Sequence, residues 1–274
     1  MMSAQVEFVL VGSDDRPIRG EARIVPGGAP AIVLSHGFKG FARWGFFPWL
    51  AEQFVAAGFT AITFDYTGSG VGADRENFTE PDAFATDTFG KELHDLNVVF
   101  RAAEARGWIT GARGLFGFSR GGGVAVLRAA RDARLGALVT WSSISTVERW
   151  SPAQIDAWRR AGYVEVVNSR TGQMLRVTTA VLDEIESKGG DELNIPGAAS
   201  RVAVPWLIVH GESDETVPVD EGRRLHGASR GGAELMLVPG ATHTYGATHG
   251  MRSATAELQA ATDRTIEFFR AKLR

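Results

Sequence analysis

Gly114-Leu115-Phe116-Gly117-Phe118-Ser119-Arg120-Gly121-Gly122-Gly123 is the stretch that decides the fold. It predicts a short apolar strand, a glycine-framed turn with one serine at its tip, and then a helix. Residues 117–121 fit the pattern G-x-S-x-G, in which a sharp strand-to-helix turn lifts a serine hydroxyl clear of a sheet. Glycine is needed there because the turn is strained and the neighbouring backbone leaves no room for a Cβ. A serine presented in this way needs a base and an acid from elsewhere in the chain.

The composition narrows the classes of protein that can hold this turn. The 274 residues carry a net charge of −3, and scattered lysines and arginines give no reason to expect a nucleic-acid partner. The absence of cysteine excludes disulfides, thiolate metal sites and a cysteine nucleophile. Residues 1–10 lack the pattern of a signal peptide, and no apolar run approaches the roughly 20 residues of a membrane span. We expect a soluble, cytoplasmic protein without a membrane partner.

The chain on either side of the serine turn alternates strands with helices. Residues 5–11 and 19–25 predict an antiparallel hairpin at a sheet edge. The pattern then predicts strands at 31–35, 60–64 and 135–141 and helices at 48–57, 88–106 and from the serine to about 131. This alternation, with short connections, favours an α/β fold: a mostly parallel sheet with helices on both faces.

The alternation of strands and helices is interrupted at residues 142–203 and then resumes. A helix at 150–161, strands at 163–167 and 174–178 around the turn-rich residues 168–172, and a short helix at 181–188 predict a small cap insertion. About 60 residues could barely hold a core alone, so we interpret residues 1–274 as a single domain. Strands at 205–210 and 234–238 and helices at 218–226 and 255–272 complete it.

Two loops after the serine offer the missing base and acid. Residues 210–218 follow one buried strand and contain Glu212, Asp214 and Glu215. Residues 239–245 follow the next strand and contain His243, with His249 as a rival base a few residues later. Both loops leave the carboxyl ends of strands, where a parallel sheet presents its functional groups.

At these loops the sequence resembles the α/β-hydrolase superfamily over nearly its whole length. The acid loop of that family, His-Gly-x-x-Asp-x-x-Val-Pro, is matched at residues 210–218 and nominates Asp214 over the two glutamates. Its Gly-Ala-x-His pattern is matched at residues 240–243 and nominates His243. The turn at residues 65–70 resembles a structural turn of the same family.

The resemblance also implies an oxyanion hole. His36-Gly37-Phe38-Lys39-Gly40 matches the family's His-Gly turn, in which the residue after His-Gly supplies a backbone N–H. That role falls to the N–H of Phe38, with the N–H of Arg120 as the second donor. Ser119, Asp214 and His243 are then the nucleophile, acid and base of a catalytic triad.

Within the superfamily, the early hairpin, the turn at residues 35–40 and the insertion look most like dienelactone-hydrolase-like and cinnamoyl- or feruloyl-type esterases. The expected activity is that of a serine hydrolase cleaving a small carboxylic ester, without a cofactor. A thioesterase, peptidase or acyltransferase would use the same triad, and a non-catalytic binding protein of the same fold is a further alternative. The oligomeric state and the natural substrate stay open.

Other patterns carry weaker interpretations. His36 and His210 precede glycines at strand ends and are expected to pack or to stabilise turns. No histidine spacing suggests a metal site. Residues 68–73 formally match a dinucleotide-binding pattern, but no helix follows them. A substrate pocket could draw on aromatic side chains near the insertion, namely Trp44, Trp150, Trp158 and Tyr163.

Overall fold

The structure is a computed structural model that describes residues 3–168 and 171–273. Its main element is an eight-stranded sheet with the strand order β1-β2-β4-β3-β5-β6-β9-β10. The strands are β1 (Ala4–Val11), β2 (Pro17–Ile24), β3 (Ala31–Ser35), β4 (Thr60–Asp65), β5 (Arg113–Phe118), β6 (Ala137–Trp141), β9 (Trp206–Gly211) and β10 (Ala233–Val238). The β1–β2 and β2–β4 pairs are antiparallel, and every other pair in this sheet is parallel. The predicted edge hairpin and mostly parallel sheet are therefore confirmed.

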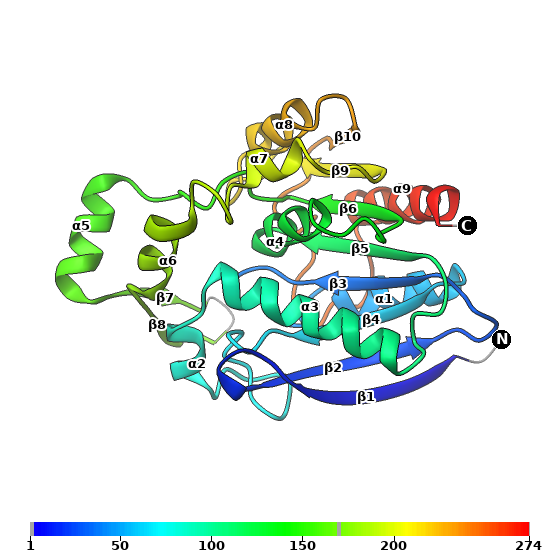
Figure 1. The fold of residues 1–274 in the computed structure, drawn as a ribbon, viewed down its shortest axis with the longest axis horizontal. Helices are drawn as coiled ribbons and strands as arrows, with labels where there is room; N and C mark the ends of the chain where they lie inside the picture. Colours follow the sequence, from blue (N-terminus) through cyan, green and yellow to red (C-terminus); the bar gives the residue numbers. More distant parts are fainter. Residues whose placement is uncertain (1–2, 169–170, 274) are drawn as a thin grey trace.

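Helices cover both faces of this sheet (Figure 1). They are α1 (Phe47–Ala56), α2 (Pro81–Ala85), α3 (Phe89–Ala105), α4 (Arg120–Ala129), α5 (Pro152–Ala161), α6 (Ala180–Lys188), α7 (Ile195–Ala199), α8 (Val219–Ala228) and α9 (Ala256–Lys272), with a 3₁₀ turn η1 (Ser13–Asp15). Figure 1 shows α3 and α4 in front of the strands and α1 and α9 behind them.

Each face of the sheet has its own apolar core. Val33 of β3 packs with the α3 and α4 side, whereas its neighbours Ile32 and Leu34 pack with the α1 and α9 side. This alternation buries the strand on both faces, which is why its sequence is a continuous apolar run rather than an alternating one. The α/β prediction rests on this physical pattern and agrees with the structure.

The insertion lies beside the ends of the parallel strands (Figure 1). It contains α5, α6 and a separate two-stranded sheet of β7 (Tyr163–Val167) and β8 (Met174–Thr178). Ser151 caps α5 in a complete capping box, as its position before Pro152 predicts. The predicted turn at residues 168–172 includes residues 169–170, which lie outside the described residues.

Two short helices were missed by the sequence prediction. Residues 71–87, where the sequence pattern predicts no helix, contain α2. The insertion range 142–203 also contains α7, which packs against α4 and α8. Both have only five residues and begin with proline in the first turn, so they show too little periodicity to be recognised. No helix of the described residues is long and apolar enough to cross a membrane.

Candidate active site

Ser119 lies at a strained turn between β5 and α4. Its backbone angles are φ 56° and ψ −123°, a region that residues with a side chain rarely adopt. The surrounding glycines are required by close approach: a Cβ on Gly121 would lie 2.2 Å from the carbonyl oxygen of His36. A Cβ on Gly117 would lie 2.6 Å from the carbonyl oxygen of Gly121. The strand and helix therefore meet closely enough to hold the serine side chain at the tip of the turn.

Ser119, His243 and Asp214 form a hydrogen-bonded row. His243 Nε2 lies 3.0 Å from Ser119 Oγ, and His243 Nδ1 lies 2.8 Å from Asp214 Oδ2. The three residues come from the loops after β5, β10 and β9, which end at the same edge of the sheet. An imidazole held between a hydroxyl and a carboxylate can accept the hydroxyl proton, and the carboxylate stabilises the resulting positive charge.

Asp214 is fixed by its own loop. Its Oδ1 accepts hydrogen bonds from the backbone N–H groups of Thr216 and Val217, at 3.0 and 2.8 Å. Burial alone would raise the pKa of Asp214, but hydrogen bonds from His210 and His243 outweigh it and hold that pKa well below its usual range. Asp214 is therefore an ionised carboxylate beside His243.

The other acids and histidines lie elsewhere. Glu212 and Glu215 are exposed, although they are close to Asp214 in sequence. His249 pairs with Glu76 at 3.4 Å and contacts the ring of Phe41. The structure thus places Asp214 and His243, rather than their rivals, next to Ser119.

His36 and His210 stabilise the two loops, as the sequence predicts. His36 accepts a hydrogen bond from the backbone N–H of Tyr66 at Nε2, 3.3 Å away, and its Nδ1 lies 2.9 Å from the carbonyl oxygen of Gly37. Burial lowers the pKa of His36, so it is neutral in the interior. His210 Nε2 lies 2.8 Å from the carbonyl oxygen of Val217 and supports the acid loop.

The two predicted oxyanion donors border the serine. A Cβ on Gly37 would lie 2.8 Å from Ser119 Cβ, so the Gly37–Phe38 turn lies directly against the nucleophile. Arg120 is the first residue of α4, where backbone N–H groups have no acceptor inside the helix. Both N–H groups thus belong to backbone beside Ser119, and their binding of an oxyanion stays a prediction.

The predicted pocket aromatics take different positions. Trp158 is buried, donates its indole N–H to the carbonyl of Val177 at 2.9 Å, and packs edge-to-face on Trp150 within the insertion. Tyr163 is exposed and lies under the guanidinium of Arg176. Trp44 packs on Phe46. The contacts of Trp150, Trp158 and Tyr163 lie within the insertion, and that of Trp44 lies within the main domain. A part in a substrate pocket stays a prediction for all four.

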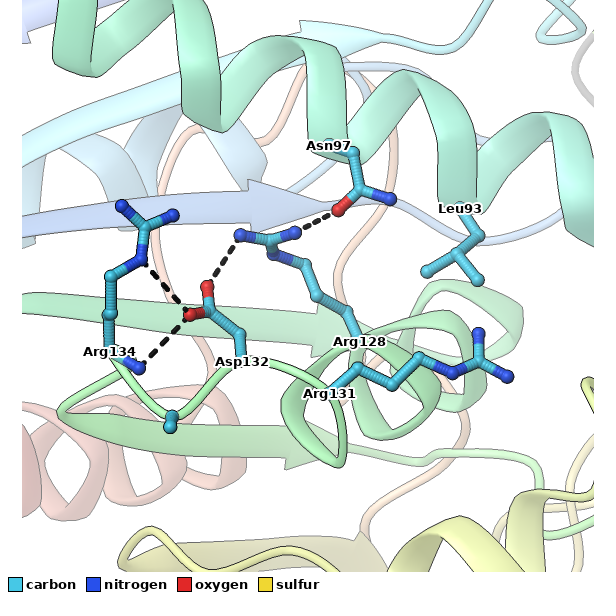
Figure 2. A pocket seen from close by; sticks show the side chains of 7 residues that line it. Leu93, Asn97, Arg128, Arg131, Asp132 and Arg134 are labelled. Atoms are coloured by element: carbon cyan, nitrogen blue, oxygen red, sulfur yellow. Dashed lines mark hydrogen bonds and ion pairs between the residues drawn. The ribbon is translucent and has the colours of Figure 1, made fainter.

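A concave region lies at the other end of α4 from the serine (Figure 2). The hollow has a volume of about 320 Å³ and is lined by Leu93, Asn97, Arg128, Arg131, Asp132, Ala133 and Arg134. Arg128 is nearly buried and binds Asn97 and Asp132. Eight residues of helix separate Arg128 from Arg120, about 12 Å, so this region is distinct from the serine site.

Comparison with known proteins shows the family of this chain. Residues 44–274 match the model of the prolyl oligopeptidase family, Peptidase_S9. The chain belongs to this family. Its fold is the α/β-hydrolase fold, and the chain is a hydrolase of the serine type.

Individual relatives are more distant. An uncharacterized 31.7 kDa protein in the traX-finO intergenic region of Escherichia coli is 30% identical over 236 residues, covering 75% of this chain and 79% of the relative. The 2,6-dihydropseudooxynicotine hydrolase of Paenarthrobacter nicotinovorans is 25% identical, over 69% of this chain and 46% of its own length. The structure of Est1E from Butyrivibrio proteoclasticus with bound ferulic acid superimposes with a TM-score of 0.75 at 18% identity, covering 97% of this chain and 98% of the other.

The sequence prediction missed a group of buried charges behind the serine. Asp87 lies just before α3, Glu92 lies in its first turn, and both contact the side chain of Arg120. One signal was present, because Glu92 falls on the same helix face as Leu96 and Val99, at the i, i+4 and i+7 positions of the apolar stripe. A charged residue on that stripe indicates a buried partner.

Proposed function

We propose that the chain hydrolyses a small carboxylic ester through an acyl-enzyme intermediate on Ser119. The observation that supports this most directly is the 3.0 Å separation of His243 Nε2 from Ser119 Oγ, with Asp214 behind the imidazole. Proximity of this kind lets the base take the serine proton as the nucleophile attacks.

In the first half-reaction, Ser119 Oγ forms a bond to the ester carbonyl carbon while His243 takes its proton. The carbonyl oxygen becomes an oxyanion, which the N–H groups of Phe38 and Arg120 bind; one such donor contributes about 3–4 kcal/mol in comparable sites. The C–O bond to the alcohol then breaks, and His243 gives its proton to the leaving oxygen.

In the second half-reaction, water takes the place of the alcohol. His243 removes a proton from the water as it attacks the acyl carbon, and the acid is released when Ser119 regains the proton. The mostly buried Ser119 and the fully buried carboxylate of Asp214 keep these charges away from bulk solvent.

Peptide hydrolysis is the second candidate, because the matching family is named for a peptidase. Thioester hydrolysis and acyl transfer share the same acyl-enzyme. Turnover of matched p-nitrophenyl esters, thioesters and peptide anilides separates these activities, and the ester proposal expects the highest kcat/KM on the ester.

The triad is tested by replacing its members one at a time. Ser119→Ala should reduce ester hydrolysis by at least about 10⁴-fold while the melting temperature stays close to that of the unchanged protein. Labelling by a fluorophosphonate should also disappear, since the probe reacts only with an activated serine. Undiminished turnover in Ser119→Ala would remove the assignment.

Two histidine variants provide a matched control. His243→Ala should lose nearly all activity, whereas His249→Ala should keep most of it, because His249 pairs with Glu76 rather than with Ser119. Equal losses in both variants would contradict the assignment of the base. A wild-type protein that the probe does not label would favour a binding role for the fold instead.

A further inference from the structure

The side chain of Arg120 is buried behind the serine turn rather than directed to solvent. Its Nη2 lies 2.9 Å from Asp87 Oδ2, and its Nε lies 3.0 Å from Glu92 Oε1. Only 10% of the Arg120 side chain is exposed, against 6% and 4% for the two acids. The first residue of α4 is therefore tied through its guanidinium to the start of α3.

The same guanidinium packs on the turn that carries the other oxyanion donor. Its Cζ lies 5.6 Å from the centre of the Phe38 ring and 4.2 Å from that of Phe89. Phe38 stacks in turn on Phe84 of α2, with ring centres 5.2 Å apart. A cation over an aromatic face attracts the ring, more strongly when the pair is buried. The Arg120 guanidinium thus contacts the side chain of Phe38, the other residue whose N–H is a proposed oxyanion donor.

The charge of Arg120 is paired inside the protein. Burial raises the pKa of Glu92 well above its ordinary value, and the nearby carboxylate of Asp87 raises it further. The two acids in turn raise the pKa of Arg120 above its ordinary value, so the guanidinium is the cation of this group. A cation paired with acids in this way can be held in the interior with a fixed geometry, whereas an unpaired charge could not.

We propose that the side chain of Arg120 is a positioning residue for the oxyanion hole. By binding Asp87 and Glu92 and packing on Phe38, it holds the N–H groups of Arg120 and Phe38 at a fixed separation beside Ser119. This inference rests on the proposed acyl-enzyme mechanism. Donors set in advance stabilise the transition state most, since no reorganisation is needed when the charge develops.

The cap insertion is bound to the same supports. Glu184 of α6 accepts hydrogen bonds from the backbone N–H of Gly90, at 3.0 Å, and from Thr88 Oγ1, at 3.1 Å, at the start of α3. Thr178 at the end of β8 donates to the carbonyl of Ala85 at 2.9 Å, at the end of α2. The insertion therefore holds both elements that pack behind the two donors.

Two variants test the positioning role without removing the cation alone from beside its two acid partners. Arg120→Lys keeps one positive charge but cannot bridge two carboxylates or lie flat on Phe38. Arg120→Met combined with Asp87→Asn removes the cation together with one acid partner and leaves Glu92, whose pKa is raised by burial and lowered by Arg120. Arg128→Met is the control, since it removes a nearly buried arginine from the same helix, away from the serine.

The readouts are kcat and KM for a p-nitrophenyl ester, the rate of labelling by a fluorophosphonate, and the melting temperature. Both Arg120 variants should fold, with kcat and the labelling rate reduced at least about tenfold and KM little changed. Arg128→Met should lower the melting temperature while kcat stays near that of the wild type. A purely structural role for Arg120 would lower stability without this selective loss of kcat.

The outcomes separate this inference from the proposed function. Wild-type kcat and labelling in either folded Arg120 variant, or an equal loss of kcat in Arg128→Met, would overturn the positioning role while leaving the triad in place. Failure of both Arg120 variants to fold would show that the guanidinium is needed for folding, and would also overturn the positioning role. A wild-type protein that neither turns over the ester nor reacts with the probe would instead overturn the proposed function.

Discussion

The two ends of α4 hold buried arginines whose pKa values are shifted in opposite directions. At the first residue, Arg120 has two carboxylate partners, and although burial lowers its pKa, Glu92 and Asp87 raise it above the ordinary value. Near the last residue, Arg128 has the carboxylate of Asp132, which also lies 3.6 Å from Arg113. Burial, with repulsion from neighbouring arginines, lowers the pKa of Arg128 to about 10.

The helix dipole explains why the two ends need different numbers of acids. A positive charge in the first turn of a helix is unfavourable, because the N-terminus carries partial positive charge, whereas the last turn favours a cation. Arg120 accordingly pairs with two acids, Asp87 just before α3 and Glu92 in its first turn, whereas Arg128 pairs with Asp132 and borders the hollow (Figure 2). At the end of α4 that borders the serine, the guanidinium is therefore held in place by two acids.

The largest expected effect comes from the close packing at the serine end. Gly121→Ala should lower the free energy of unfolding by about 3 kcal/mol and reduce activity, because the new Cβ would displace the backbone of His36 beside the oxyanion turn. Urea denaturation and ester turnover measure both effects. Gly227→Ala in α8 is the control: its Cβ would meet nothing within 4 Å, so stability should rise by about 0.5–1 kcal/mol. A fully stable Gly121→Ala protein would contradict the close approach.

A smaller effect is expected on the pH dependence of stability. The unfolded chain loses the Glu92 proton near the ordinary pKa of 4.5, whereas the folded protein keeps it to a higher pH. Between these two values the folded state binds more protons, so the free energy of unfolding contributed by Glu92 falls as the pH rises. Glu92→Gln should flatten that decline in denaturation curves collected from pH 4.5 upward. Glu165→Gln on the exposed hairpin should follow the wild-type curve; an unchanged slope in Glu92→Gln would argue against the retained proton.

The smallest effect is expected at the exposed rim of the arginine-lined hollow. Arg131 is exposed and donates to the backbone carbonyl of Glu192. Arg131→Gln should change the free energy of unfolding by less than about 0.5 kcal/mol and leave turnover unchanged. A loss of activity in this variant would show that the two ends of α4 are coupled and would remove the contrast between them.

The parts of the molecule that the sequence predicted share one property. The strands β3 and β4, the long helix α3 and the cap of α5 each depend on neighbours within a few residues, through apolar periodicity or a capping side chain. The short helices α2 and α7 were missed because packing against other elements, rather than their own sequence, stabilises five residues of helix.

The sequence by itself determined the α/β alternation and the three loops that carry Ser119, Asp214 and His243, because local patterns of strand periodicity, turn residues and glycines identify them. Only the tertiary structure decided which distant groups meet behind them. Arg120 at the start of α4 pairs with Asp87, just before α3, and with Glu92 in its first turn. Glu184 binds Gly90, 94 residues away in the sequence. Buried charges are paired by the packing of whole helices and strands, so the spacing of residues along the chain does not predict which of them form pairs.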